Sequence, residues 1–249
     1  MVFEGEHPAA PKCVAFALLE AAEMNVMTST DNEASKKAIR ALRRSFEWWS
    51  RNGAETILLY DESFDDANLL ESGRRFAELC LVEDENEKQS VAFCLKRIDA
   101  STGCVVEMKG ASRRRSDGDT KSEEDERCSG RRKKTKTTDV ILLDPSSGYE
   151  ILINFAKTKS VLAGECAMEE HTEPELVRAF ERKLEELRMF LPAPELLVVV
   201  SKVFSCGKFP GWLLSKCELT RVPKIDSLND AKNEEIFRRY SFSLQRYGK

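Results

Sequence analysis

The chain has 249 residues, of which 41% are hydrophobic and 33% are charged, and its formal net charge is −4. This length and apolar content suffice for one sizeable core, so we expect one α/β domain or two small ones. The acidic balance argues against a generally nucleic-acid-binding surface. No apolar run approaches the roughly 20 residues of a membrane-spanning helix, and the first residues lack a signal-peptide pattern, so we expect the chain as given to be soluble.

Cysteine and histidine spacing gives no sign of a metal site. None of the eight cysteines forms a Cys-x-x-Cys pair, and the two histidines, His7 and His171, are far apart in the sequence. Structural zinc sites need such closely spaced ligands. We therefore expect no metal ligands in this chain, and reduced thiols of a cytosolic compartment.

The amino-terminal part alternates short apolar runs with a helical pattern. The run 13–19 predicts a buried strand, 36–52 predicts a helix that ends at Asn52-Gly53, and 56–60 predicts a second strand. The apolar residues of the helix share one face: Ile39, Leu42, Phe46 and Trp49. Of the adjacent tryptophans, we expect Trp49 in the core and Trp48 at its edge. Because a strand, a helix and a strand in this order form a βαβ unit, we expect a parallel sheet.

The rest of the chain continues the alternation. Further strands are predicted at 90–97, 104–108, 139–143, 195–200 and 218–222. Further helices are predicted at about 66–81, within 149–162, at about 173–190 and at 226–246. The pattern therefore predicts a single α/β domain over 1–249 with a central, mostly parallel sheet flanked by helices.

One segment, 109–138, differs in character from the rest. It contains eleven Lys or Arg and six Asp or Glu, with almost no aliphatic or aromatic residue to bury. Such a composition does not offset the entropy cost of ordering, so we predict a disordered, charged insertion. Its basic run, 131–136, is one hypothesis for nucleic-acid binding, but acidic residues lie nearby and no aromatic residue is interleaved for base stacking. A solvated insertion with no nucleic-acid partner is the favoured interpretation.

Familiar catalytic motifs are absent from the sequence. It has no Gly-x-Ser-x-Gly, no phosphate-binding glycine-rich loop and no His-Glu-x-x-His. His7 lies near the start of the chain, and His171 lies in an acidic connection that is typical of a surface loop. The residues alone therefore do not identify an independent catalytic centre.

An ordered series of segments nevertheless resembles one family, the cis-prenyltransferase superfamily. The similar segments are, in chain order, 12–16, 53–61, Pro194–Val200, Phe209–Leu214, Glu218–Thr220 and the ending Arg246-Tyr247-Gly248-Lys249. The resemblance is to the non-catalytic subunit of dehydrodolichyl diphosphate synthase, the Nogo-B receptor family. It implies the cis-prenyltransferase fold and covers most of the chain outside the insertion.

Two departures from the catalytic members concern diphosphate binding. Those members follow the first strand with Asp-Gly-Asn-Arg-Arg, whereas this chain has Leu18-Leu19-Glu20-Ala21-Ala22. They follow the later strand with Arg-Thr-Gly-Gly-Glu, whereas this chain has 201–205, Ser-Lys-Val-Phe-Ser. Glu20 is an oxygen ligand for Mg²⁺ in principle, but without the glycine and arginines nothing binds the phosphates. The resemblance thus implies a subunit that is inactive alone.

The carboxyl-terminal Arg-x-Gly is retained, and the resemblance gives it a role. In heteromeric members this tail enters the active site of the partner, where Arg246 and Gly248 would be catalytic and substrate-binding residues supplied in trans. A guanidinium binds phosphate in a bidentate manner, and glycine lets the backbone approach a ligand closely. We expect the surface that contacts the partner to include Phe209, Trp212, Leu214 and Glu218.

The resemblance also implies the rest of the assembly. The complex would be a ditrans,polycis-polyprenyl diphosphate synthase that condenses isopentenyl diphosphate onto farnesyl diphosphate for dolichol synthesis and protein glycosylation. A catalytic cis-prenyltransferase subunit would be the heteromeric partner and would hold the Mg²⁺ cofactor. The expected location is the cytoplasmic face of the endoplasmic reticulum membrane, reached through the partner or through an amino-terminal segment missing from this sequence.

Two alternatives stay open. The first is a degenerate prenyltransferase fold that serves only as an interaction module, with no contribution to catalysis. The second is a nucleic-acid regulator that acts through 131–136, for which binding would depend strongly on salt.

Overall fold

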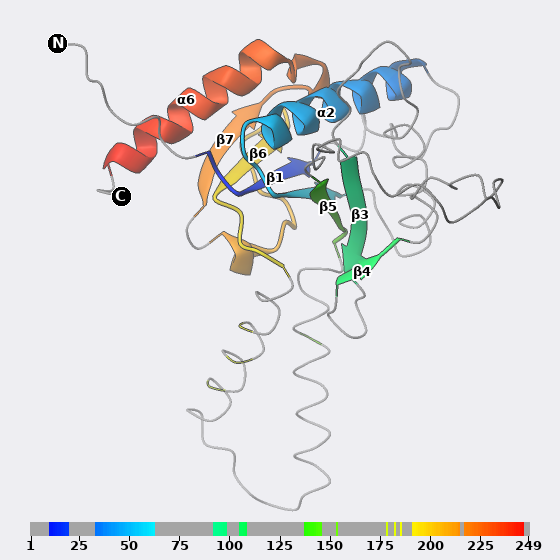
Figure 1. Ribbon diagram of the computed structural model, residues 1–249, viewed down its shortest axis with the longest axis vertical. Helices are drawn as coiled ribbons and strands as arrows, with labels where there is room; N and C mark the ends of the chain where they lie inside the picture. Colours follow the sequence, from blue (N-terminus) through cyan, green and yellow to red (C-terminus); the bar gives the residue numbers. More distant parts are fainter. Residues whose placement is uncertain are drawn as a thin grey trace, which may run out of the picture.

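A twisted seven-stranded sheet forms the centre of the computed structural model (Figure 1). The structure describes residues 10–19, 33–62, 92–98, 105–108, 137–145, 191–214 and 217–246, together with the helical backbone at 153, 178, 182 and 185. The strands are β1 (Cys13–Leu18), β2 (Thr56–Asp61), β3 (Ala92–Ile98), β4 (Val105–Glu107), β5 (Thr137–Leu143), β6 (Leu196–Val200) and β7 (Glu218–Val222). Their order across the sheet is β4-β3-β5-β2-β1-β6-β7.

All neighbouring pairs in this sheet are parallel except β3 and β4 at one edge. The first unit is the predicted βαβ: helix α2 (Glu33–Arg51) connects β1 to the adjacent parallel strand β2. The strands β1, β2, β5 and β6 are buried almost completely, which is typical of a parallel sheet that is covered on both faces. The predicted mostly parallel α/β sheet is therefore confirmed.

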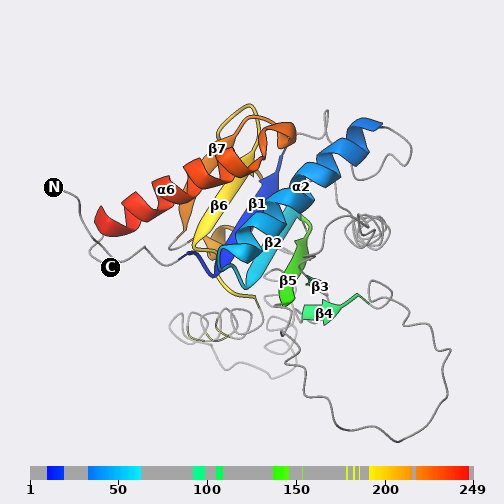
Figure 2. The ribbon, with the colours of Figure 1, turned by 45° about the horizontal axis from the view of Figure 1, so that its top comes forward.

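Two helices cover one face of this sheet. Helix α6 (Asp230–Arg246) lies next to α2, and both cross the strands on the same side (Figure 2). The core under them includes Phe16, Leu59 and Val198, together with Ile236 from α6. On the opposite face a second core contains Ala15, Leu58 and Val199, against which the 3₁₀ turn η1 (Gly211–Leu213) packs. Alternate residues of each strand thus point into separate cores, as the twofold period of a strand requires.

The amphipathic face predicted for α2 is the face that is buried. Leu42, Phe46 and Trp49 are each 0% exposed. Trp48 is half-buried, and its ring lies edge-on to Trp49 with centroids 4.9 Å apart. The assignment of Trp49 to the core and Trp48 to its edge is confirmed. The helix ends where predicted, since Gly53 has the left-handed φ of +118° that glycine adopts readily.

Helix α6 begins later than the predicted 226. Residues Ile225–Ser227 form the 3₁₀ turn η2, and α6 starts at Asp230 because Asn229 caps it. The Asn229 side-chain oxygen accepts a hydrogen bond of 2.9 Å from the backbone N–H of Lys232, which satisfies one of the free donors of the first turn.

The boundary of the charged insertion also differs from the prediction. Strand β5 starts at Thr137, so Thr137 and Thr138 belong to the sheet, paired with β3, and not to the insertion. The hydroxyls of Thr138 and Ser50 are buried and 2.6 Å apart, so this threonine has a partner in the interior. The rest of the predicted insertion, 109–136, and the helix predicted at 66–81 lie outside the described residues. Most residues of the helices predicted within 149–162 and at 173–190 also lie outside them.

Candidate functional site

The carboxyl ends of the strands form the edge where parallel α/β sheets bind ligands. Strands β1, β2 and β5 end side by side here, because Leu18 is in register with Asp61 and Tyr60 with Leu143. Asp61 ends β2 and Asp144 directly follows β5. These two aspartates, only 0% and 2% exposed, therefore occupy neighbouring positions on adjoining strands.

Asp61 and Asp144 were not among the predicted site residues. The signal that would have found them is an aspartate placed directly after the apolar run of a buried strand. Both take part in interactions within the chain. Burial raises the pKa of the Tyr60 hydroxyl, and the carboxylates of Glu62, Asp61 and Asp144 raise it further. This edge therefore carries two buried acidic side chains close to the Tyr60 hydroxyl.

The loop after β6 folds back onto the residue that follows β1. It contains two tight turns, in which the Val203 N–H donates to the Ser201 hydroxyl and the Gly207 N–H donates to the Ser205 hydroxyl, each at 3.1 Å. Gly207 has a φ of +52°, and a Cβ at this position would lie 2.8 Å from Cδ2 of Leu19. The Leu19 side chain thus packs against the loop that follows β6.

The described residues contain no preformed cluster of metal ligands. Within the parts of the chain that the structure describes, no group of three or more His, Cys, Asp or Glu side chains is arranged to hold a metal ion. Asp61 and Asp144 therefore lack a third acidic ligand among these residues. Glu20, His7 and His171 lie outside the described residues. In the same described ranges, no helix has the length and apolar content needed to cross a bilayer.

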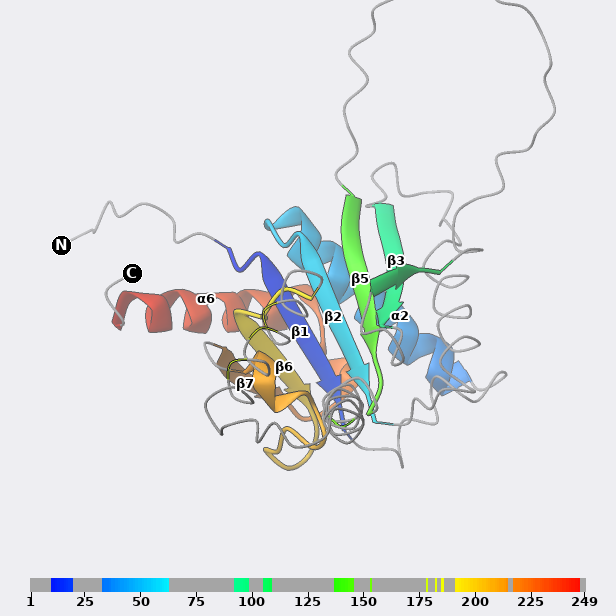
Figure 3. The same ribbon diagram turned by 90° about the horizontal axis from the view of Figure 1, so that it is seen from below.

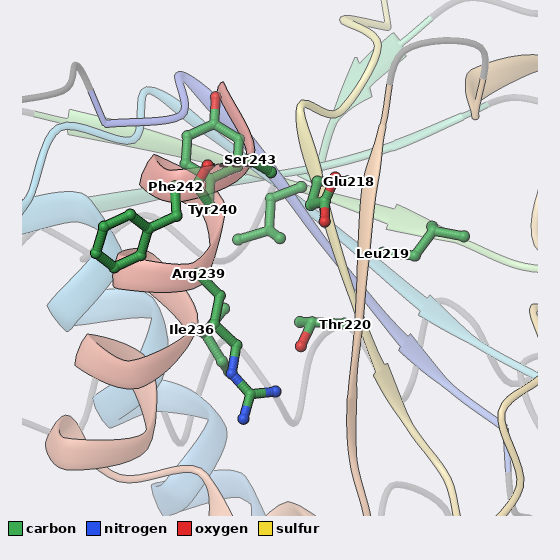
Figure 4. A pocket seen from close by; sticks show the side chains of 9 residues that line it. Glu218, Leu219, Thr220, Ile236, Arg239, Tyr240, Phe242 and Ser243 are labelled. Carbon is green, nitrogen blue, oxygen red and sulfur yellow. Dashed lines mark hydrogen bonds between the residues drawn. The ribbon is translucent and has the colours of Figure 1, made fainter. Parts of the chain in front are cut away.

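A groove of about 600 Å³ lies between the edge strand β7 and helix α6 (Figure 4). Its walls include Glu218 and Thr220 from β7, and Ile236 and Arg239 from α6. The Arg239 side chain extends into the gap between helix and strand, whereas Leu219 points to the other side of β7. The guanidinium of Arg239 pairs with Glu235 on the preceding turn of α6. The groove thus has mixed polar and apolar walls, with one acidic and one basic side chain among them.

The structure does not bring the four predicted interface residues to one surface. Phe209 is 2% exposed and lies in the second core, with its ring edge-on to Tyr60 at 5.6 Å. Trp212 and Leu214 are half-buried and pack against the same core. Glu218 lines the groove on the opposite face of the sheet, towards α6. The Phe209 side chain therefore packs in the interior of this chain, whereas Glu218 is accessible from the groove.

The predicted tail residues lie at the end of α6. Arg246 is the last residue of this helix, which extends along the side of the molecule next to β6 and β7 (Figure 3). Gly248 lies outside the described residues, so its predicted role is not addressed by the structure. Since β7 is the outermost strand, α6 delivers its carboxyl end at one edge of the sheet.

Three cysteines lie near one another on the face opposite to α2. Cys13 is buried in the second core, and Cys206 and Cys217 pack against it. These three and Cys94 are free thiols. Burial raises the pKa of Cys217 to about 12, and the nearby Cys206, Glu218 and Glu195 contribute in the same direction. Such thiols are protonated at neutral pH and therefore poor nucleophiles.

Comparisons with known proteins identify the fold through solved structures, but not through family models or curated sequences. No protein-family model matches the chain, and no curated protein matches it. Among solved structures, it is similar to lavandulyl diphosphate synthase from Lavandula x intermedia, in complex with dimethylallyl diphosphate, with a TM-score of 0.57 and 15% identity over 94% of this chain and 96% of that chain. It is also similar to a probable undecaprenyl diphosphate synthase from Campylobacter jejuni, with a TM-score of 0.47 and 13% identity over 92% of this chain and 94% of that chain. Both are cis-prenyltransferases. The first match covers nearly all of both chains and agrees with the mostly parallel sheet, so this protein has the cis-prenyltransferase fold.

Proposed function

We propose that this chain is the accessory, non-catalytic subunit of a heteromeric cis-prenyltransferase. The observation that carries the proposal is the contact between Leu19 and Gly207. In catalytic members, the segments after β1 and β6 are expected to hold the diphosphates. In this chain Leu19, which follows β1, lies against Gly207, two residues beyond the 201–205 segment that follows β6, and two buried aspartates lie at the ends of neighbouring strands. Neither feature favours binding of an anion at this edge.

The role of the carboxyl-terminal tail completes the proposal. Arg246 would enter the partner's active site and bind the diphosphate of isopentenyl diphosphate, with Gly248 allowing the backbone to come close. An arginine matches two phosphate oxygens at once and keeps its charge at any physiological pH. Positive charge placed beforehand where negative charge develops is the largest contribution in many transfer reactions. The position of Arg246 at the end of α6, beside the outermost strand, supports delivery to a second chain.

The groove and the residues that border it offer a surface for a partner near this tail. Phe242 on α6 borders the groove and is 61% exposed. Large exposed hydrophobic side chains beside a concave surface are typical of protein-protein contacts. The partner surface would therefore include Glu218 and Phe242. Contact of the partner with Trp212 and Leu214, which are half-buried on the other face of the sheet, stays a prediction.

The proposed complex elongates farnesyl diphosphate with isopentenyl diphosphate to a long polyprenyl diphosphate, the dehydrodolichyl diphosphate used for dolichol and protein glycosylation. The partner would supply the Mg²⁺ site and the substrate tunnel, since this chain lacks the Asp-Gly-Asn-Arg-Arg that follows the first strand in catalytic members. The endoplasmic reticulum location belongs to the same proposal.

The test is incorporation of labelled isopentenyl diphosphate by this chain alone, by a candidate catalytic subunit alone, and by the co-purified pair. We expect strong activity only from the pair. Activity of this chain alone would contradict the assignment of a non-catalytic subunit.

A matched pair of arginine variants then separates the accessory role from the alternative of a pure interaction module. In the co-purified complex, Arg246→Ala is expected to lower incorporation without loss of the partner. Arg238→Ala changes an exposed arginine on the same helix, paired with Glu234, and is expected to have no effect. If the pair forms and the two variants behave alike, the interaction module becomes the better description.

A further inference from the structure

One glutamate at the start of β6 joins the last helix to the sheet. Both carboxylate oxygens of Glu195 accept hydrogen bonds: Oε2 from the Tyr240 hydroxyl at 2.8 Å, and Oε1 from the backbone N–H of Lys12 at 2.9 Å. Bonds to an ionised acceptor are stronger than those between neutral groups. The carboxylate is therefore fixed from two sides, by the helix and by the segment leading into β1.

The backbone of Glu195 is also held between two strands. Its N–H donates to the Cys13 carbonyl at 2.9 Å, and its carbonyl accepts from the N–H of Glu218 at 2.9 Å. Glu195 therefore belongs to the rigid sheet and links the amino ends of β1, β6 and β7. A side chain bound to such a residue takes its position from the sheet.

Tyr240 connects this anchor to the carboxyl-terminal part of α6. Its side chain is 2% exposed, and burial together with the bond to Glu195 raises the pKa of its hydroxyl, so that it stays a donor at physiological pH. Arg246 ends the helix six residues later, which at the rise of an α-helix is about 9 Å along the axis. The buried side-chain bond at the other end of α6, from Ser45 to Asn233, lies much farther from Arg246.

We infer that Glu195 and Tyr240 are positioning residues, which set the direction in which the carboxyl-terminal tail leaves the domain and thereby place Arg246 for use in trans. This inference rests on the proposed function and deepens it. Catalytic groups must be held within a fraction of an ångström by side chains that are themselves fixed, and a shift of about 1 Å can cost two orders of magnitude in rate. A helix that ends in a functional arginine needs such an anchor close to that end.

The first readout does not depend on the partner. Tyr240→Phe keeps the ring and removes only the hydroxyl, so the helix can pack but loses its bond to Glu195. We expect hydrogen exchange of the backbone amides at 241–246 in the isolated chain to become faster in this variant. Ser45→Ala, which removes a buried bond to the amino-terminal half of α6, is the matched control and is expected to leave exchange at 241–246 unchanged.

The second readout uses the co-purified complex at a temperature where all variants are folded. Tyr240→Phe is expected to raise KM for isopentenyl diphosphate about tenfold, the factor typical of one lost hydrogen bond to a charged group, with the partner still bound. Ser45→Ala is expected to leave KM and kcat unchanged. Glu195→Gln keeps an oxygen that accepts from the Lys12 N–H and gains an amide N–H that can donate to the Tyr240 hydroxyl. The KM of this variant should therefore be close to that of the native complex. Glu195→Asp is too short to hold both donors and should resemble Tyr240→Phe.

The possible failures can be told apart. If Arg246→Ala leaves activity unchanged, the proposed function fails, and the exchange experiment still reports whether the pair orders the end of α6. If Arg246→Ala lowers activity but Tyr240→Phe changes neither exchange nor KM, the positioning role is overturned. It is equally overturned if Ser45→Ala produces the same changes as Tyr240→Phe, because the effect is then one of general stability.

Discussion

The hydroxyl of Ser45 on α2 donates a hydrogen bond of 2.9 Å to the side-chain oxygen of Asn233 on α6, and both residues are 0% exposed. This bond lies between the two helices that cover one face of the sheet. Ser45→Ala leaves the Asn233 oxygen buried without its donor, so we expect the free energy of unfolding to fall by about 1–3 kcal/mol. Urea denaturation measures the change.

An exposed contact in the same region provides the control for this prediction. Lys37 on α2 pairs with Asp226 in η2 at 2.8 Å, with side chains that are 69% and 47% exposed. Because water and ions screen such a pair, Lys37→Ala should cost less than about 1 kcal/mol. Equal losses of unfolding free energy in the two variants would show that the buried bond stabilises the fold no more than the exposed ion pair does.

Two glycines in the segment between β6 and β7 should respond differently to alanine. Gly207 has a φ of +52°, and its new Cβ would meet Leu19 at 2.8 Å, so Gly207→Ala should destabilise the fold by about 1–3 kcal/mol. Gly211 has no atom within 4 Å of its Cβ position, so Gly211→Ala should be nearly neutral. Adding Leu19→Ala should recover part of the Gly207→Ala loss. Thermal unfolding of the four proteins tests this, and the absence of any recovery would contradict the Leu19 contact.

The adjacent tryptophans of α2 predict unequal costs of truncation. Trp49 is 0% exposed, and Trp49→Ala should cost about 3–5 kcal/mol because it opens a cavity in the core. Trp48 is half-buried beside Phe237, so Trp48→Ala should cost clearly less. Urea denaturation of both variants decides the point, and a larger loss for Trp48 would contradict the packing described for α2.

Stability should fall at alkaline pH through the buried thiols. The pKa of Cys217 is about 12 in the folded chain, whereas an unfolded thiol has a pKa near 8.5. A folded-state pKa above the unfolded value gives stability that is complete below about pH 8.5 and is lost as the pH rises towards 12. We therefore expect Cys217→Ala to show a smaller loss of unfolding free energy between pH 8 and pH 11 than the native protein. Parallel pH curves for the two proteins would refute this contribution.

The elements that sequence patterns predict best are those with a buried apolar face. The strands 56–60 and 218–222 were located almost to the residue, and the helix with Phe46 and Trp49 to within three residues, since burial imposes a period on the sequence. The start of β5 was missed because Thr137 and Thr138 are polar, and their fit in the interior depends on Ser50, which is distant in the sequence. The start of α6 was missed because Asn229, and not Asp226, caps the helix.

Site residues were harder to predict than strands. Phe209 was predicted at the interface because its segment resembles the family, but only the folded chain shows that its ring packs against Tyr60 in the second core. Asp61 and Asp144 are neighbours because of the register of β2 and β5, which sequence periodicity does not specify. The contact between Leu19 and Gly207 joins positions 188 residues apart in the chain, and no local pattern reports it.

The order of strands keeps the attachment of the charged segment away from β7 and α6. The charged segment 109–136 is attached between Met108, after β4, and Thr137, at the start of β5, whereas β7 and α6 lie at the other edge of the sheet. A lengthened or shortened segment at this attachment would leave the hydrogen bonds of Glu195 and the end of α6 untouched. The same place is therefore suited to an affinity tag or a fluorescent reporter, which would follow assembly without disturbing the carboxyl-terminal tail.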